Sequence, residues 1–245
     1  MYLAKTLGRS LWIAAIPAST VGAQARLRPR SVAFWAAAGG TLAVAALSDE
    51  RARTLSITHR SGILRTFADA GNEMGTGRNL IAALAVTYVG ARLAHRRSTA
   101  DAVLRISAGY ALSNAIVGTL KPIVGRHRPD STNDAWRFSP FAARGAWHSF
   151  PSSHTVHAFS LATGVTLLSK RPWAAAIAYS SASVVAWSRV YDDQHWASDV
   201  TSSAIIGIAT SATVNHWLDR RLPNVGNRES GIGNRRNLGM LLEAR

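Results

Sequence analysis

Six apolar segments divide most of this chain and constrain how it can fold. They cover about residues 32–48, 79–94, 103–120, 155–169, 173–187 and 200–217. Most are shorter than the roughly 20 residues with which a helix crosses a bilayer. They are rich in Ala, Gly, Ser and Thr, which suit close helix packing in lipid but equally suit a soluble bundle. The pattern indicates packed helices and leaves a membrane form and a soluble form open.

The positive charge of the chain is distributed in a way that argues against nucleic-acid binding. The formal net charge is +15 over 245 residues, but the basic residues lie in short clusters beside the apolar segments. Such clusters are typical of the cytoplasmic side of a membrane protein, so we expect no nucleic-acid partner. They are Arg26–Arg30, His95–Arg97, Lys170–Arg171, Arg220–Arg221 and Arg235–Arg236.

Two features of the composition limit the remaining possibilities. The chain has no cysteine, which excludes disulfides, thiolate zinc sites and cysteine nucleophiles. Its mean hydropathy of +0.04 is modest for a polytopic membrane protein and favours the soluble alternative.

The last four apolar segments agree with one membrane topology. If all four span, three basic clusters between residues 95 and 221 fall on one side, which is the cytoplasmic side by the positive-inside rule. Trp173 and Trp217 then lie near the inner helix ends, and Trp187 and Trp196 near the outer ends, as in an aromatic belt. The polar motifs described below all fall on the outer side.

The N-terminus does not fit this topology as simply. Residues 1–25 resemble a secretory signal, with Ala23-Gln24-Ala25 as a small-x-small cleavage site, but an uncleaved first helix is the alternative. After cleavage, segments 32–48, 79–94 and 103–120 would place the motifs inside if all three spanned. One of them must then not span, or residues 1–25 stay cytoplasmic, or the protein is soluble.

We expect four regions along the chain. Residues 1–25 form the signal-like segment, 26–100 the N-terminal helices, 101–220 the core, and 221–245 a flexible basic tail. Within them, Asp49–Asn79 is expected to be interfacial or extramembrane, and Pro129–Phe150 a long loop.

The first polar motif, Lys121-x6-Arg128-Pro129, places two permanent cations close together where we expect an apolar helix to end at Pro122. Arg offers a planar fork and Lys a mobile point charge, so the pair suits the oxygens of a phosphate. A juxtamembrane basic patch that binds lipid headgroups is the alternative.

The second motif, Pro151-Ser152-Ser153-His154, precedes an apolar helix. A serine there can cap the helix, whose first free N–H groups bind anions, and His154 would lie beside them as a proton donor. A plain capping sequence with an incidental histidine is the alternative. His154 and His157 have the His-x-x-His spacing of half a metal site. Asp192-Asp193 could be recruited to it, but no third ligand is clearly supplied, so we expect no metal.

The third motif, Ser188-Arg189-x5-His195-x3-Asp199, is the most specific. If residues 195–199 are helical, His195 and Asp199 share a face. Asp199 would hold one ring nitrogen as N–H and leave the other free to attack phosphorus, while Arg189 adds a third cation. A surface His–Asp pair with a local salt-bridge cluster is the alternative.

Taken together, the three motifs resemble those of the type 2 phosphatidic acid phosphatases, a superfamily shared with bacterial acid phosphatases and vanadium haloperoxidases. The first and third motifs match at every defined position, and Ser153 stands where the family usually has glycine. The resemblance covers about residues 100–217. The N-terminal hundred residues and the tail carry no signature.

The resemblance implies an all-α helical bundle and a metal-independent phosphatase without a cofactor. Transferred by position, His195 would form a phosphohistidine, Asp199 would orient it, and His154 would protonate the leaving group. The phosphoryl oxygens would be bound by Lys121, Arg128, Ser152, Ser153 and Arg189.

Membrane members of the family act on lipid phosphates or diphosphates at outward-facing sites. We therefore expect a multi-pass protein of a bacterial-type inner membrane with a lipid phosphate substrate. The alternatives are a secreted or periplasmic acid phosphatase, a haloperoxidase, and a non-catalytic protein that binds anionic lipid.

Overall fold

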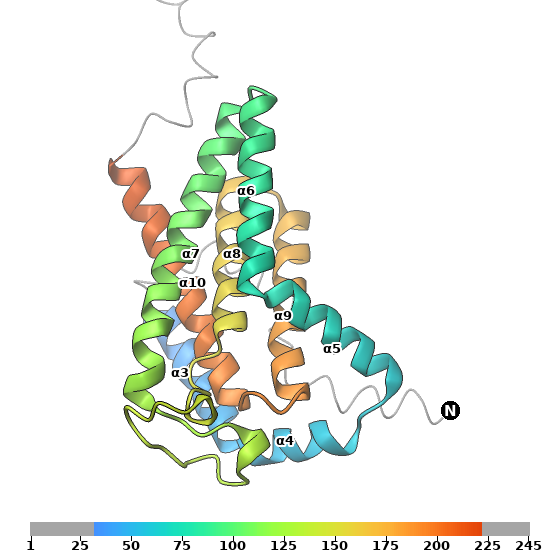
Figure 1. The fold of residues 1–245 in the computed structure, drawn as a ribbon. Helices are drawn as coiled ribbons and strands as arrows, with labels where there is room; N and C mark the ends of the chain where they lie inside the picture. Colours follow the sequence, from blue (N-terminus) through green and yellow to red (C-terminus); the bar gives the residue numbers. More distant parts are fainter. Residues whose placement is uncertain (1–31, 222–245) are drawn as a thin grey trace, which may run out of the picture.

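The computed structural model describes residues 32–221, and these residues form a helical bundle (Figure 1). Within this range there is no strand, but one isolated bridge joins Arg126 to Phe138. The expected all-α fold is confirmed. The predicted signal-like segment and almost all of the basic tail lie outside the described residues. The helices are α3 (Val32–Leu47), α4 (Asp49–Thr58), α5 (Gly62–Gly75), α6 (Gly77–Leu93), α7 (Arg97–Val124), α8 (Ser153–Ser169), α9 (Pro172–Tyr191) and α10 (Ala197–Arg221).

Helix α8 lies at the centre of the bundle and packs against α7, α9 and α10. The core around it contains large side chains such as Phe159 and Tyr179 between many alanines. Several buried side chains are small and polar, and their hydroxyls bond within the bundle, as Ser113 does to Ser160. Small side chains let helix backbones approach closely, both in membrane bundles and in soluble ones.

The two ends of the bundle differ in chemistry. In Figure 1 the α6–α7 and α8–α9 connections lie at one end, and the 125–152 loop and the α9–α10 connection lie at the other. The first end carries the basic clusters His95–Arg97 and Lys170–Arg171, and the second carries the three polar motifs. This separation is the one expected from the sequence.

Among the described helices, α7 alone has both the length and the apolar composition needed to cross a membrane. The bent pair α3 and α4, which meet at 60°, is a second candidate if it is counted as one span. Of the four spans expected from the sequence, the three in α8, α9 and α10 do not meet this combined test.

The end of α7 differs from the expected one. The helix continues through Pro122 and ends at Val124, where Gly125 adopts a left-handed conformation with φ of 57°. A Cβ at Gly125 would lie 2.0 Å from the carbonyl oxygen of Ser139, so only glycine fits there. The loop that follows contains two short 3-10 turns, Pro129–Ser131 and Gly145–Trp147, and it folds back over the end of the bundle.

Helix α5 packs on α9 through small residues. Its Ala68, Gly71 and Gly75 are buried, and they lie three or four positions apart on one face. A Cβ at Gly75 would lie 2.5 Å from Cγ1 of Val185 and 3.0 Å from the His154 side chain. This close approach brings α5, from the N-terminal region that carries no motif, against the predicted site.

We expect Gly75→Ala to destabilise the protein by about 1–3 kcal/mol, because the added methyl group overpacks the contact with Val185 and His154. The matched control is Gly90→Ala in α6, where an added Cβ meets no atom within 4 Å. That variant should be neutral or slightly stabilising, since alanine is the better helix former. The measurement is the thermal unfolding midpoint of the purified protein, and equal midpoints for both variants would contradict this packing.

Candidate active site

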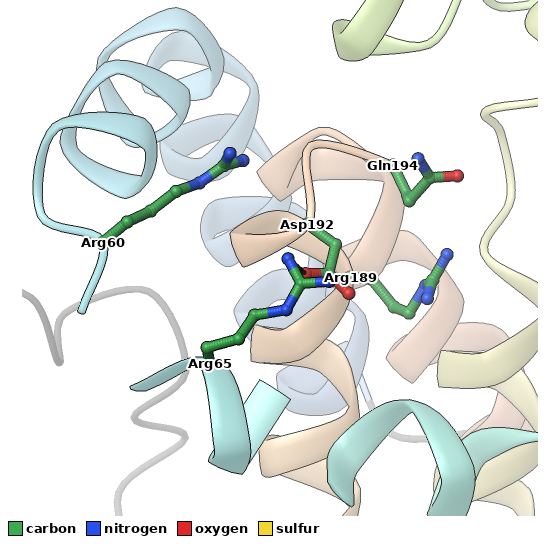
Figure 2. Close-up of a pocket in the computed structure, with 5 residues that line it drawn as sticks. All are labelled: Arg60, Arg65, Arg189, Asp192 and Gln194. Atoms are coloured by element: carbon green, nitrogen blue, oxygen red, sulfur yellow. Dashed lines mark ion pairs between the residues drawn. The ribbon is translucent and has the colours of Figure 1, made fainter. Parts of the chain in front are cut away.

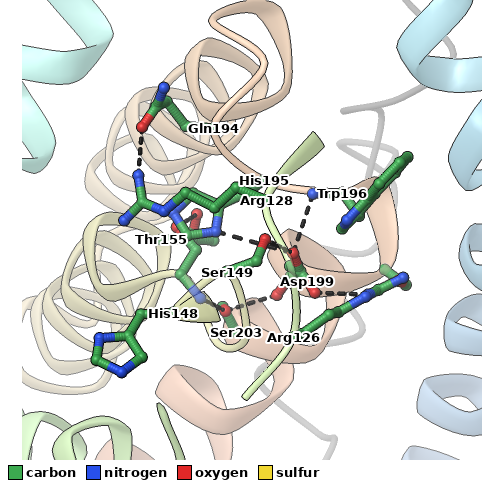
Figure 3. Close-up of polar contacts among 12 residues, drawn as sticks. Arg126, Arg128, His148, Ser149, Thr155, Gln194, His195, Trp196, Asp199 and Ser203 are labelled. Atoms are coloured by element: carbon green, nitrogen blue, oxygen red, sulfur yellow. Dashed lines mark hydrogen bonds and ion pairs between the residues drawn. The ribbon is translucent and has the colours of Figure 1, made fainter. Parts of the chain in front are cut away.

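The carboxylate of Asp199 is the centre of the predicted site, and it is fully buried (Figure 3). It accepts hydrogen bonds from Arg126 Nη1 at 2.6 Å, Ser149 Oγ at 2.5 Å and the backbone N–H of Trp196 at 3.0 Å. Burial raises the pKa of a carboxyl, but its interactions with His195, Arg126 and Ser149 outweigh this and hold the Asp199 pKa below its ordinary value. Asp199 is therefore an anion at neutral pH.

Asp199 also determines where α10 begins. It is the third residue of the helix, and its side chain reaches back to the N–H of Trp196, which directly precedes the helix. This is half of a capping box, and a negative charge in the first turn is favoured by the helix dipole. The condition that residues 195–199 are all helical is therefore not met, because His195 lies before α10.

His195 still lies next to Asp199. Its Nδ1 is 3.9 Å from Asp199 Oδ2, a distance of electrostatic attraction rather than of a hydrogen bond. The ring is 4 % exposed. Burial lowers the pKa of His195 to about 4, against the opposing pull of Asp199, so the imidazole is neutral at neutral pH. Since Nδ1 faces the carboxylate, Nε2 is the nitrogen that can act as a nucleophile.

The three predicted cations are held by polar partners from distant parts of the chain. Lys121 Nζ donates to the carbonyl of His148 at 2.8 Å, and Arg128 donates to the side-chain oxygen of Gln194. Arg189 donates to the side-chain oxygen of Asn72 in α5. These bonds fix each head group without neutralising it, because all three partners are uncharged.

Two of these guanidinium groups keep an unused donor. The Nε atoms of Arg128 and Arg189 are buried and have no hydrogen-bond partner among the described residues. Burial lowers the pKa of Arg189, Asp192 opposes this, and the nearby charge of Arg128 lowers it further. Buried donors without a partner are rare, and donors of two neighbouring cations suit an anion.

His154 belongs to the same group of charges. It is half-buried in the first turn of α8, ahead of the apolar segment 155–169. Burial and the charges of Arg189 and Lys121 lower its pKa to about 3. The structure thus brings His154 within electrostatic range of the second histidine and of two predicted phosphate ligands.

The two serines of the second motif have different environments. Ser152 is fully buried at the N-cap position of α8, but its side chain makes no cap hydrogen bond. Its backbone N–H donates to Ser203 Oγ at 2.7 Å, so this amide is already engaged. Ser153 begins α8 and is half-buried. The expected serine cap is therefore not formed.

His157, considered as half of a metal site, has a different setting. Its Nε2 lies 3.1 Å from the Asn114 side-chain oxygen, and its ring is tilted at 40° against the Tyr110 ring, with the ring centroids 4.6 Å apart. No three His, Asp or Glu side chains gather in metal-binding geometry within residues 32–221.

Arg126 is the residue of this site that the motifs do not identify. It lies inside the six-residue spacer between Lys121 and Arg128, and its side chain is 5 % exposed. Its guanidinium bridges two buried carboxylates, Asp199 at 2.6 Å and Asp49 of α4 at 2.8 Å. A basic residue inside the spacer is a signal for such a role, but nothing in the sequence links it to Asp49.

Other supporting groups complete the surroundings of Arg126. Its Nη1 donates to Ser198 Oγ at 2.7 Å, and its remaining donors bond the carbonyl of Ala135. Asp49 accepts both the N–H and the hydroxyl of Ser198. All the charged atoms in this network are thereby paired, and the start of α4 is joined to the start of α10.

The fold and the site together define a class of protein: a helical bundle that presents a buried His–Asp pair and three cations at one end. A family model described as the PAP2 superfamily matches residues 102–223. The chain belongs to the PAP2 superfamily, and the resemblance noted from its motifs is confirmed.

Two curated relatives and two solved structures are similar to this chain. It is 36% identical over 112 residues to a lipid A 1-phosphatase of Porphyromonas gingivalis, covering 45% of this chain and 22% of the relative. It is 31% identical over 106 residues to a putative undecaprenyl-diphosphatase of Escherichia coli, covering 43% of this chain and 52% of the relative. The matches thus span at most about half the length of these relatives.

The solved structures support the fold. LpxE of Aquifex aeolicus superimposes with a TM-score of 0.56 at 22% identity, covering 69% of this chain and 94% of that one. A transmembrane PAP2-type phosphatidylglycerolphosphate phosphatase of Bacillus subtilis gives 0.53 at 21% identity, covering 89% and 96%.

We expect Arg126→Met to destabilise the protein by about 3–5 kcal/mol, because removing this cation leaves two buried carboxylates without their partner. The matched control is Arg105→Met, whose ion pair with the 64 % exposed Asp219 is open to solvent and should contribute less than about 1 kcal/mol. Chemical unfolding of both variants is the measurement. A loss at Arg126 no larger than at Arg105 would contradict the network.

Proposed function

We propose that this protein is a metal-independent phosphatase that hydrolyses a lipid phosphate or diphosphate through a phosphohistidine, at an outward-facing membrane site. One observation carries the proposal: a neutral, buried His195 lies 3.9 Å from an ionised Asp199, within the electrostatic field of Lys121 and Arg189. This arrangement suits a nucleophile with its orienting base and a group of cations for the phosphoryl oxygens.

In the first step, Nε2 of His195 attacks phosphorus and the bond to the leaving oxygen breaks. Asp199 stabilises the positive charge that develops on the ring through Nδ1. Lys121, Arg128 and Arg189 neutralise the phosphoryl oxygens, where charge accumulates in the transition state. In this proposal the backbone N–H of Ser153, the first residue of α8, adds a further donor.

His154 supplies the proton that the leaving oxygen needs. In the free protein, burial and the neighbouring cations keep its pKa near 3. A bound phosphate carries negative charge that offsets those cations and raises the pKa of His154. His154 therefore becomes protonated when the substrate binds. In the second step it takes a proton from water, the water oxygen attacks phosphorus, and the P–N bond breaks. Free phosphate leaves, and His195 is neutral again.

The outer surface of the bundle supports a membrane location. Large apolar side chains project outward from several helices, whereas Arg126 and Asp199 are buried inside. An extended apolar surface of this kind marks contact with lipid or with another protein. Examples more than 45 % exposed are Ile81, Val86, Leu104, Leu112, Trp173 and Trp217. A lipid tail in the bilayer would leave its headgroup at the site end.

A soluble acid phosphatase is the second candidate. Among the described helices, α7 is long and apolar enough to cross a membrane, and the bent α3–α4 pair adds at most one more such segment. Carbonate washing of isolated membranes separates the two. We expect the protein to stay with the membrane fraction, and its release would favour the soluble form.

We expect purified protein to release phosphate from lipid monophosphates or isoprenoid diphosphates with chelator present. His195→Ala should lower this rate by at least about 10⁴-fold, because no other group replaces the nucleophile. The control is His59→Ala, at the exposed end of α4, which should keep its activity. Full activity in His195→Ala, or release from no ester by the wild type, would contradict the proposal.

A further inference from the structure

A polar cavity adjoins the predicted phosphate site on the side of α4 and α5 (Figure 2). Its volume is about 390 Å³, and it is lined by Arg60, Arg65, Arg189, Asp192 and Gln194. Arg189 is shared with the predicted phosphate site, and Gln194 holds Arg128. Through Arg189 the cavity therefore adjoins the predicted phosphate site.

The charge of this cavity is positive. Three arginines face one carboxylate, Asp192, which leaves a net charge of +2. Asp192 also accepts a hydrogen bond from Asn72, the same side chain that holds Arg189. One carboxylate therefore offsets only part of the arginine charge, and the cavity favours an anionic ligand.

Arg60 is fixed at the rim of the cavity. Its Nη2 donates to the carbonyl of Tyr191 at 3.1 Å, and its guanidinium lies 5.8 Å from the centre of the Tyr191 ring. Both contacts are to an uncharged residue at the end of α9, so they orient the cation without neutralising it.

Arg65 is held less tightly. Its ion pairs with Asp69 at 3.2 Å and with Asp192 at 3.7 Å are longer than ideal, and its side chain is 60 % exposed. Ion pairs as exposed as the one with Asp69 contribute little. Arg65 can therefore turn its guanidinium to a ligand at small cost.

We propose that this cavity is a subsite for a second phosphate group of the substrate, bound by Arg60 and Arg65 beside the phosphate that is hydrolysed. This inference rests on the proposed function and narrows its substrate class to lipids whose headgroup carries two phosphates, as a diphosphate does. The reacting phosphate is held by Lys121, Arg128 and Arg189. The second group extends past Arg189 into the cavity.

The test compares an isoprenoid diphosphate with the monophosphate of the same tail, using the full chain in detergent. In the double variant Arg60→Gln/Arg65→Gln, the ratio of kcat/KM for diphosphate over monophosphate should fall about 10-fold or more, because two charge-assisted contacts are lost. If Arg65→Lys replaces Arg65→Gln in this double variant, the positive charge is kept and part of the lost ratio should be recovered. Arg92→Gln, which removes an exposed arginine at the far end of α6, should keep the wild-type ratio. An unchanged ratio in the double variant overturns the subsite.

A binding measurement separates this inference from the proposed activity. Inorganic diphosphate should raise the unfolding midpoint of the wild type more than inorganic phosphate does, and the double variant should lose this difference. If the wild type hydrolyses neither substrate but shows the difference, the activity fails and the subsite stands. Equal shifts from both anions in the wild type overturn the subsite.

Discussion

The bridge from Arg126 to Asp49 and Asp199 is the interaction on which the rest of the site depends. Two carboxylates and one guanidinium are almost completely buried, and their separations are 2.8 and 2.6 Å. Burying such charges costs several kcal/mol for each ion, so the network persists only because nearly every donor and acceptor is satisfied. The network therefore fixes one geometry, and removing any one partner would leave a buried charge unpaired.

That geometry joins three parts of the chain that are distant in sequence. Asp49 begins α4, Arg126 follows α7, and Asp199 lies in the first turn of α10. Because Arg126, Ser149 and Trp196 occupy the oxygens of Asp199, the carboxylate has one orientation toward His195. Helix α5 adds Asn72, which holds Arg189. The N-terminal helices therefore form part of the site.

The position of the three motifs at one end of the bundle could be predicted from the sequence, because each motif lies at a helix end. His195 and Asp199 are four positions apart, and the turn that precedes α10 keeps them adjacent even though His195 is not helical. Helix boundaries are predicted less well. Proline at position 122 suggests a helix end, but α7 continues to Val124 and ends at the left-handed Gly125, so the proline costs one i→i−4 hydrogen bond without ending the helix.

Partners that are distant in sequence could not be predicted from spacing. Asp49 and Ser198 bond across 149 positions, and Asn72 and Arg189 across 117. Such pairs arise from the tertiary packing of α4 and α5, which depends on small residues such as Gly71 and Gly75 at a contact that no motif describes. The functional roles of all the predicted site residues remain predictions: His195, His154 and Asp199 in catalysis, and Lys121, Arg128, Ser152, Ser153 and Arg189 in phosphate binding.

The most direct test of the central claim is a crystal or cryo-EM structure of the protein with vanadate, which imitates the five-coordinate state of phosphorus. We expect vanadium bonded to Nε2 of His195, with its oxygens in contact with Lys121, Arg128 and Arg189, and with Asp199 still held by Arg126. Vanadate bonded to another side chain, or bound away from His195, would contradict it.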